Sequence, residues 1–318
     1  MRSSVLGFGG SAMLGRVGRK ASLTALAAAY DAGITFFDTA RSYGYGESEA
    51  LLGEFLQGRR DSVLISTKFG ILPARTNLLK QSFKPLARKL LQLAPATRIA
   101  MRKQLAAQSS ANHFTVAALH ASLDTSLRAL RTDYIDLLFM HEAPVTVLQQ
   151  EDLLAALGQL VAEGKVRRFG ISSHPPVIEA ALAANLPGLR SVQFPCNLFD
   201  LGLARKLGVH GSDIVAIANH PFGGAQRIAE RKSLLASLAQ YPGAPKSLRE
   251  KLHNVDDAVL ADVVLNAITR DTGIQIVVPS MLRLDHLRAN IAAIEHSRFN
   301  SEELHWLRDA LPPTPPHQ

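Results

Sequence analysis

Four side chains that could take part in proton transfer lie in three motifs in the first half of the chain. Asp38 and Tyr43 are five residues apart, whereas Lys68 and His141 each end a short run of apolar and β-branched residues. A phenol with a pKa near 10 exchanges its proton poorly at neutral pH, and a neighbouring ammonium group favours the phenolate. We therefore expect Asp38 to pair with Lys68, and Lys68 to lower the pKa of Tyr43.

The elements that must position these residues follow a regular alternation. Eight short runs have the composition of buried strands, at residues 5–9, 34–38, 63–68, 135–140, 168–172, 191–194, 214–218 and 274–278. Segments with helical spacing of apolar residues separate most of these runs, and the clearest are 22–30, 47–56, 116–130, 152–162 and 256–272. This pattern predicts a (β/α)8 barrel. No proline- or serine-rich linker interrupts it, so we expect a single domain over residues 1–318.

The predicted barrel explains why the four residues should converge. In such barrels the C-terminal ends of the strands form the catalytic face. Asp38, Lys68 and His141 end three consecutive predicted strands, and Tyr43 follows the first of them. Each could be an ordinary polar residue at a strand end, but an acid, a phenol, an amine and an imidazole together favour a catalytic site.

Three segments depart from the simple alternation. Residues 71–114, which follow the third predicted strand, are too long for an ordinary loop, and leucine spacing suggests two short helices there. Residues 219–255 are rich in glycine and proline and are interpreted as a second long loop. The tail at 311–318 contains four prolines and is expected to be loose.

Composition excludes several classes of protein. Hydrophobic residues make up 47% of the 318 residues and charged residues 19%, which is not the composition of a disordered chain. The single cysteine, Cys196, excludes a disulfide framework and a cysteine-based metal site, and we expect no metal. The sequence has neither an 18-residue apolar stretch nor a secretory signal at its start, so we expect a cytoplasmic protein.

The net charge of +8 is confined to one segment. Residues 71–114 contain eight lysines and arginines and no acid, which leaves 27 basic and 27 acidic residues in the rest of the chain. The barrel itself is therefore neutral, and we expect no binding to nucleic acid.

The first glycine-rich motif is not a Rossmann fingerprint. Residues 7–12 match the form G-x-G-x-x-A, but the next helical pattern begins only around residues 19–22. The fingerprint needs a helix immediately after the turn. We interpret this stretch as a loop after the first strand.

Taken together, the motifs resemble those of the aldo-keto reductases over nearly the whole chain outside 71–114. The matching segments are residues 37–40 with Tyr43 and Gly44, residues 66–68, residues 133–137 leading to His141, and residues 164–172. Residues 43–49 are most similar to the bacterial sugar-aldehyde and aldose dehydrogenase branches of the family.

The resemblance implies NAD(P)-dependent interconversion of a carbonyl and an alcohol, on a barrel that binds the dinucleotide without a Rossmann fold. Tyr43 would be the acid/base, supported by Lys68 and Asp38, and His141 would orient the carbonyl oxygen. The substrate would be a small carbonyl compound or alcohol, either sugar-like or anionic.

The resemblance also implies a set of cofactor contacts, with NADP narrowly preferred to NAD. The residues expected to bind the dinucleotide are Gly10, Asp38, Ser172, Ser173, Gln193, Pro221, Phe222, Ser280, Arg283, His286 and Asn290. Ser172 and Gln193 would hold the nicotinamide carboxamide, and Ser173 replaces the family's usual asparagine. Residues 219–224 would form the pyrophosphate loop. Arg283 would pair with the 2′-phosphate of NADP.

Two other functions remain open. Lys68 could form a Schiff base in a class I aldolase, although this leaves the spacing of Asp38 and Tyr43 unexplained. The chain could also be a cofactor-binding sensor or interaction protein, like the potassium-channel β subunits. For either function, residues 71–114 could form a lid or docking surface for an anionic substrate, an acidic partner or a membrane. The alternative is a solvated loop.

Overall fold

The computed structural model describes residues 3–14, 17–73, 113–209, 213–270 and 272–311. In this part of the chain, eight parallel strands pair in sequence order into one sheet. They are β1 (Gly7–Gly9), β2 (Phe36–Asp38), β3 (Leu64–Phe69), β4 (Ile135–His141), β5 (Val166–Ser172), β6 (Leu189–Pro195), β7 (Val215–Asn219) and β8 (Ile274–Val278). All eight predicted strands are confirmed, with ends shifted by up to two residues.

The sheet curves round so that its two edges meet. The backbone N–H of Val277 donates to the carbonyl of Val5 at 2.9 Å, and that of Gly9 donates to the carbonyl of Pro279 at 3.0 Å. These bonds bring β8 beside β1 and nearly close the barrel. The fold is therefore the predicted (β/α)8 barrel.

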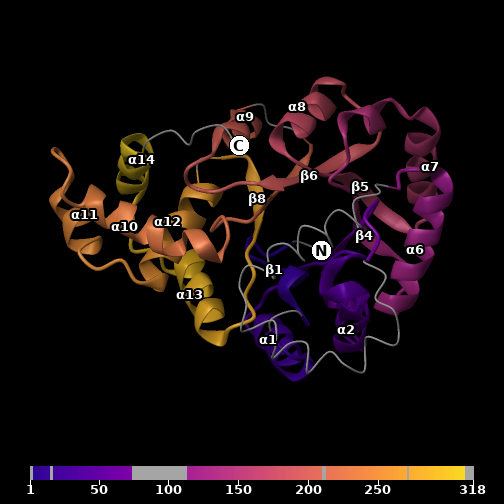
Figure 1. Cartoon of the computed structure of the whole chain (residues 1–318), viewed down its shortest axis with the longest axis horizontal. Helices are drawn as coiled ribbons and strands as arrows, with labels where there is room; N and C mark the ends of the chain where they lie inside the picture. Colours follow the sequence, from indigo (N-terminus) through magenta and orange to yellow (C-terminus); the bar gives the residue numbers. More distant parts are fainter. Residues whose placement is uncertain (1–2, 15–16, 74–112, 210–212, 271, 312–318) are drawn as a thin grey trace, which may run out of the picture.

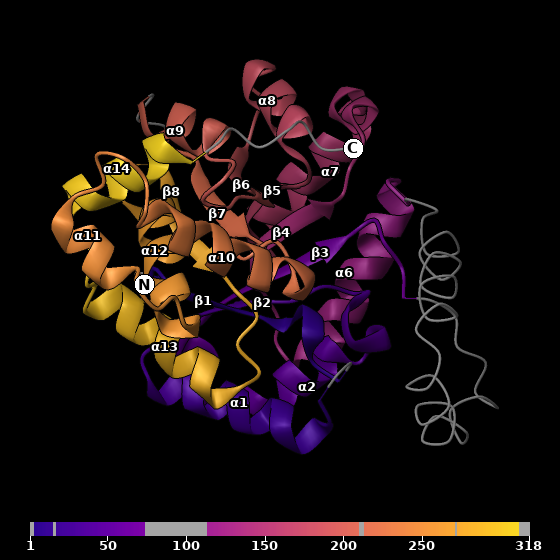
Figure 2. The same cartoon turned by 60° about the vertical axis from the view of Figure 1, so that its left-hand side comes forward.

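Helices surround the strands on the outside (Figure 1). The α-helices of the described residues are α1 (Arg19–Asp31), α2 (Ser48–Phe55), α6 (Val116–Leu130), α7 (Glu151–Ala162), α8 (Pro175–Ala183), α9 (Gly202–Val209), α10 (Ile228–Leu238), α11 (Lys246–Lys251), α12 (Asp257–Thr269), α13 (Leu284–Glu295) and α14 (Ser301–Ala310). Figure 2 shows α1, α2, α6, α7 and α8 arranged around the strands, and α11 to α14 grouped on the side of β8.

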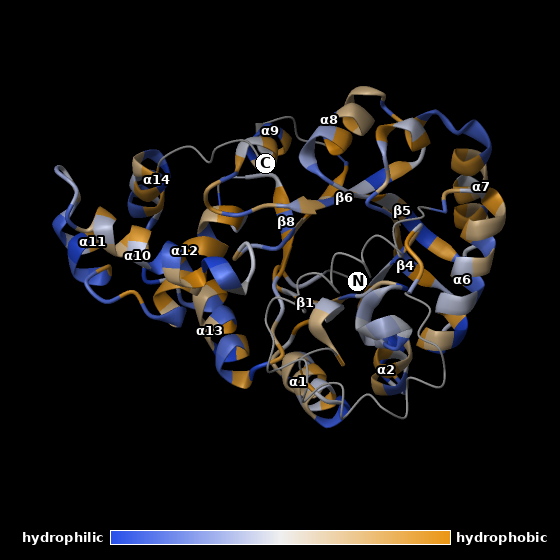
Figure 3. Cartoon of the chain, in the orientation of Figure 1, coloured by the Kyte–Doolittle hydropathy of each residue, from blue (hydrophilic) through white to orange (hydrophobic). Residues whose placement is uncertain are grey.

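The core has two parts because each strand alternates between two apolar surroundings. Inside the barrel, Phe36, Leu137, Phe139, Ile217 and Ile276 form one cluster. A larger cluster lies between the strands and the helices. Figure 3 shows the outer helices with hydrophobic and hydrophilic stretches alternating along them, as expected of helices that cover a core on one side only.

The segment at 219–255 is not the loop that its glycine and proline content suggested. It contains the short 3₁₀ turn η5 (Ala225–Arg227) and the helices α10 and α11. Leu235, Leu238 and Leu248 are buried and hold these helices against the barrel. Pro245 lies at the N-cap of α11, so here proline starts a helix instead of preventing one.

Two other segments fall largely outside the described residues. They are most of the insert at 71–114 and nearly all of the tail at 311–318. The two helices predicted in the insert and the looseness predicted for the tail therefore stay predictions. The two ends of the insert are described and meet: the N–H of His113 donates to the carbonyl of Gly70 at 2.8 Å. Among the described residues, every helix is too short or too polar to cross a membrane.

The loop after β1 has the form expected from the sequence. It continues as a 3₁₀ turn, η1 (Gly10–Ala12), and α1 begins only at Arg19. A Cβ atom at Gly10 would come within 2.8 Å of the Asp38 carbonyl oxygen, so glycine is needed for the close packing of this turn on β2.

Candidate active site

Tyr43 is held by an unusual turn after β2. The 3₁₀ segment η2 (Tyr43–Gly46) has left-handed backbone angles at Gly44 (φ 58°) and Tyr45 (φ 59°). Left-handed angles are uncommon for a residue with a side chain and often occur at functional sites. Ser48 fixes the end of the turn by a 3.0 Å hydrogen bond between its hydroxyl and that of Thr39.

Lys68 and Asp38 form a buried ion pair at the C-terminal ends of β3 and β2. The Lys68 ammonium donates to Asp38 Oδ1 at 2.7 Å, to Oδ2 at 2.8 Å and to the carbonyl of Thr39 at 2.9 Å. Lys68 is only 1% exposed, and burial lowers its pKa. The charge of Asp38 and then the Tyr43 hydroxyl act in the opposite direction, and the net pKa is raised. Lys68 is therefore a fixed cation.

Tyr43 and His141 both face this ion pair. Lys68 Nζ lies 4.8 Å from the centre of the Tyr43 ring, and the His141 ring meets the Tyr43 ring edge-on with 5.8 Å between centres. The structure thus brings together all four residues of the predicted catalytic set. Burial and then the positive charge of Lys68 lower the pKa of His141 to about 3, so its imidazole is neutral at physiological pH.

Lys68 lowers the pKa of Tyr43 as expected, but other effects outweigh it and the net pKa is raised. Burial raises the pKa of Tyr43 by disfavouring the phenolate, and Lys68 opposes this effect without overcoming it. The negative charges of Asp38 and Glu142 raise the pKa further. Tyr43 is therefore a neutral phenol in this structure, which is the protonated form that a proton donor needs.

A chain of buried hydrogen bonds extends the site toward β5 and β6. The Gln193 amide donates to Asp38 Oδ1 at 3.0 Å, and the Ser172 hydroxyl donates to Gln193 Oε1 at 2.7 Å. Ser173 is also buried and donates to the carbonyl of Ala143 at 3.1 Å. The residues predicted to hold a carboxamide group therefore lie directly beside the four central residues.

Gly10, another predicted cofactor residue, is buried in the turn η1 after β1. The remaining predicted cofactor residues lie in two further places. Pro221 is buried and Phe222 half-buried in the loop after β7. A second group follows β8, and it consists of Ser280, Arg283, His286 and Asn290. Arg283 is exposed, and its Nε donates to Asp285 Oδ1 at 3.0 Å. Any 2′-phosphate bound there would compete with Asp285 for the guanidinium.

Sequence reasoning missed several residues near the site. Glu49 on α2 is buried and accepts hydrogen bonds from Thr67 at 2.7 Å and from Arg41 at 3.0 Å, which ties β3 to the turn that carries Tyr43. Glu142 has a left-handed φ of 51° immediately after His141. Arg231 on α10 is buried beside the loop after β7. Of Glu49, Glu142 and Arg231, only Glu49 lies in a motif identified from the sequence, at residues 43–49.

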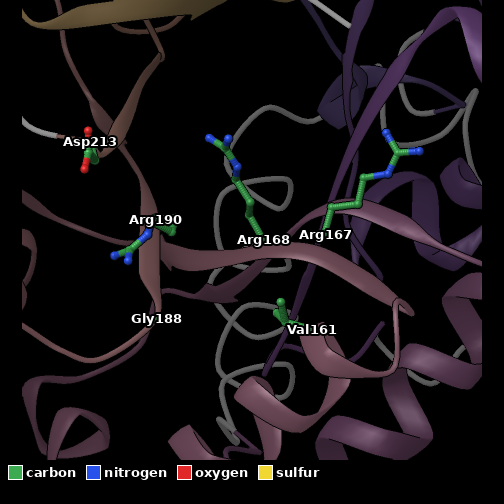
Figure 4. A pocket seen from close by; sticks show the side chains of 6 residues that line it. All are labelled: Val161, Arg167, Arg168, Gly188, Arg190 and Asp213. Carbon is green, nitrogen blue, oxygen red and sulfur yellow. The ribbon is translucent and has the colours of Figure 1, made fainter.

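A cavity of about 530 Å³ lies at the opposite end of the barrel and is separate from this site. Its lining residues belong to the N-terminal ends of β5 and β6 and to the segments beside them, and they are Val161, Arg167, Arg168, Gly188, Arg190 and Asp213 (Figure 4). In barrels of this class the N-terminal face contributes to stability and the C-terminal face to chemistry. We therefore assign the candidate site to the C-terminal end.

Fold and site together define a parallel α/β barrel with acid–base residues on its catalytic face. The chain belongs to the Aldo/keto reductase family, whose model matches residues 5–311. One relative, "Aldo-keto reductase YhdN" of Bacillus subtilis, is 28% identical over 206 residues, which cover 64% of this chain and 52% of the relative. "Aryl-alcohol dehydrogenase GME11368" of Pestalotiopsis microspora is 28% identical over 287 residues, which cover 83% of this chain and 66% of the relative. The chain therefore spans about half to two thirds of these relatives' lengths.

Solved structures share the fold. An aldo-keto reductase of Bacillus halodurans in its holo form superposes with a TM-score of 0.68 at 20% identity, covering 100% of this chain and 95% of that one. An aldo/keto reductase of Klebsiella pneumoniae in complex with NADP and acetate superposes with a TM-score of 0.65 at 22% identity, covering 99% and 94%.

Proposed function

We propose that this protein is an NAD(P)H-dependent oxidoreductase that interconverts an aldehyde or ketone and the corresponding alcohol, with Tyr43 as the proton donor. The observation that carries the proposal is the buried ion pair of Lys68 and Asp38 beside the Tyr43 ring. A neutral His141, whose ring contacts the Tyr43 ring edge-on, completes the set.

The chemistry that a bound nicotinamide supplies is hydride transfer to the carbonyl carbon. The oxygen then becomes an alkoxide and needs a proton, which the Tyr43 hydroxyl donates. The Lys68 ammonium stabilises the phenolate left behind, and Asp38 keeps that ammonium in place. His141 is uncharged and can donate a hydrogen bond to the carbonyl oxygen, which orients it and favours charge build-up there.

The residues around Asp38 fit a nicotinamide. Ser172 and Gln193 supply a buried hydroxyl and a buried amide, which are the donor and acceptor that a carboxamide needs. NADP is the proposed cofactor and NAD the alternative. The Klebsiella pneumoniae relative was solved with NADP, and the "Aryl-alcohol dehydrogenase [NADP(+)]" of Phanerodontia chrysosporium is named for it.

The environment of Lys68 argues against a Schiff-base aldolase. An amine must lose its proton to attack a carbonyl. The hydrogen bonds from Lys68 to Asp38 and to the Thr39 carbonyl stabilise its charged form, and its pKa is raised. The reductase proposal explains this environment, because it requires a permanent cation beside Tyr43.

Turnover on a panel of aldehydes tests the proposal against a sensor that only binds the cofactor. We expect NADPH oxidation that depends on the aldehyde, including sugar-like, anionic and aromatic members. Tight NADPH binding without turnover on any member would favour the sensor. Trapping of substrate on Lys68 by borohydride would favour the aldolase.

A further inference from the structure

Three arginines line the cavity at the N-terminal end of the barrel, on the face opposite to the candidate active site (Figure 4). Arg167 and Arg168 lie on β5, and Arg190 lies on β6. Of the described residues that line the cavity, Asp213 is the only one with a carboxylate. Three guanidinium groups and one carboxylate leave an excess of two positive charges in a cavity of about 530 Å³.

Contacts with β4 and the residue before it occupy Arg167. Its Nη1 lies 3.1 Å from Asp136 Oδ1, and its guanidinium lies 4.2 Å from the centre of the Tyr134 ring. Figure 4 shows the side chains of Arg167 and Arg168 leaving neighbouring positions of β5 in different directions. Arg168 and Arg190 are therefore the two arginines that remain available for a ligand.

The strand register directs Arg168 toward the axis of the barrel. Leu137 on β4 pairs with Arg168, and Phe139 pairs with Gly170. Leu137 and Phe139 both belong to the apolar cluster inside the barrel. Side chains at paired positions of neighbouring strands lie on the same face of a sheet. Arg168 therefore lies at the N-terminal mouth of the barrel, next to the inner apolar cluster.

A β-bulge places Arg190 at the same mouth. The pairing of β5 with β6 shifts between Phe169 and Gly170, which leaves Arg190 as an extra residue without an opposite partner. Bulges are rare between parallel strands, and they re-aim a side chain. Gly188, just before the bulge, has a left-handed φ of 77°, and a Cβ atom there would lie 3.0 Å from the Phe169 ring. The chain is thus closely packed where it presents Arg190 to the cavity that Arg168 also lines.

Arg168 and Arg190 are exposed, and within the described residues no carboxylate forms an ion pair with either. The Nη1 atom of Arg190 donates to the neighbouring carbonyl of Leu189 at 3.1 Å. By contrast, the exposed Arg19 pairs with Glu54. Arginine stays charged at neutral pH, and cations in a concave site with apolar walls concentrate their potential and attract anions. An anion bound between the two guanidinium groups would also remove their mutual repulsion.

We propose that Arg168 and Arg190 bind the phosphate group of a small phosphate monoester at the N-terminal mouth of the barrel, and that Asp213 accepts hydrogen bonds from hydroxyl groups of the same ligand. Guanidinium groups bind phosphate oxygens bidentately. A phosphate monoester carries a charge of about −1.5 to −2 at neutral pH, which matches the excess positive charge of the lining. The cavity volume falls in the range of small-molecule sites, about 300–1,000 Å³.

The test measures the Kd values of ribose 5-phosphate, glycerol 3-phosphate and unphosphorylated ribose for the full-length protein by isothermal titration calorimetry. Each titration is done with and without saturating NADPH, because a phosphate probe in the proposed cofactor site would be displaced by the dinucleotide. The variants are Arg168→Met and Arg190→Met. Arg205→Met is the matched control, because Arg205 is an exposed arginine on α9 that does not line the cavity.

We expect the parent to bind at least one of the two phosphates and not ribose, with the same Kd in the presence of NADPH. Arg168→Met and Arg190→Met should each weaken this binding about tenfold or more, because each removes charge-assisted hydrogen bonds to the phosphate. Arg205→Met should match the parent.

Four results would overturn the inference. Absence of binding by both phosphates would mean that the cavity holds no phosphate monoester, and equal binding of ribose would mean that the phosphate group is not recognised. Displacement by NADPH would assign the binding to the cofactor site. Unchanged Kd values in Arg168→Met or Arg190→Met would remove that arginine from the site. The calorimetry needs neither turnover nor a bound dinucleotide, so its result stands even if the proposed reaction fails.

Discussion

At the scale of single residues, the protonation state of Tyr43 results from opposing effects. Burial and the charges of Asp38 and Glu142 favour the neutral phenol, while Lys68 favours the phenolate. The charge of Glu142 makes the smallest of these contributions and adds to that of Asp38 in favouring the neutral phenol. We therefore expect Glu142 to shift the pH range in which Tyr43 can donate a proton.

Replacement of Glu142 by glutamine tests this electrostatic effect. Its negative charge raises the pKa of Tyr43, so its removal should lower that pKa. Carbonyl reduction needs the protonated phenol, and the alkaline limb of the kcat/KM profile should therefore move to lower pH. No acidic limb from His141 is expected between pH 5 and 8, because the pKa of that imidazole is about 3.

The control for this measurement is Glu179→Gln, which removes an exposed carboxylate paired with Lys206 on the outer surface. Its profile should match that of the parent. An alkaline limb that stays fixed in Glu142→Gln would mean that the charge at residue 142 has no effect on the group that titrates.

The residue types and their places at strand ends predicted which residues form the candidate site, but not the pKa values of those residues. Asp38, Lys68 and His141 could be placed because strand ends converge in a barrel. The pKa of Tyr43 depends on burial, which a sequence does not show. Arg231 was missed because it lies in a segment whose glycines and prolines suggested a loop.

At the scale of elements, the site depends on how the turn after β2 is joined to β3. Glu49 connects them, since it binds Arg41 beside the turn and Thr67 next to Lys68. Glycines at 44 and 46 allow the left-handed backbone that presents Tyr43. The spacing of the motif indicated this turn, whereas the burial of the Glu49 carboxylate could be seen only in the structure.

Glu49→Gln should therefore destabilise the protein. In this variant the Arg41 guanidinium loses its ion pair with the Glu49 carboxylate. Its Nε is already buried and has no hydrogen-bond partner among the described residues. We expect the free energy of unfolding, measured by urea denaturation, to fall by about 2 kcal/mol or more.

Glu54→Gln on the same helix is the matched comparison. Glu54 forms an ion pair with Arg19 at the surface, where both side chains are exposed, and such pairs contribute about 0–1 kcal/mol. Equal losses in the two variants would contradict the role assigned to Glu49.

At the scale of the whole molecule, the N-terminal face of the barrel contributes to stability and the C-terminal face carries the candidate site. The strands and the helices α1, α2, α6, α7 and α12 were predictable because the alternation of strand and helix patterns repeats along the chain. The helices α8, α9, α13 and α14 were not predicted. The basic insert at 71–114 was recognisable only as an interruption of this alternation, because the charge composition of a segment does not show which elements it packs against. Its base is closed by the bond between Gly70 and His113, with Phe114 packed edge-on against Phe69 at 5.8 Å.

Replacement of residues 75–110 by a short Gly/Ser loop should leave the fold and the cofactor affinity intact, because the described contacts at its base lie outside the deletion. β3 ends at Phe69, one residue after Lys68, and the insert begins at residue 71. Because the insert starts this close to the site, we expect KM for the substrate to change. Any binding of the parent to anionic vesicles should be lost, and it should weaken with salt in the parent.

Circular dichroism, NADPH titration, steady-state kinetics and vesicle sedimentation would measure these effects. A shortened protein identical to its parent in kinetics, vesicle binding and salt response would mean that the insert is a passive loop. An insoluble one would mean that its leucines cover part of the barrel.

The most direct test of the account is the kinetics of Tyr43→Phe, with the Kd of NADPH measured on the same preparation. The phenol is needed only when the proton moves, so kcat should fall by about 10² or more. The Kd should stay nearly unchanged, because the cofactor contacts proposed here lie mainly at β5 to β8. Unchanged turnover in Tyr43→Phe would contradict the proposed mechanism.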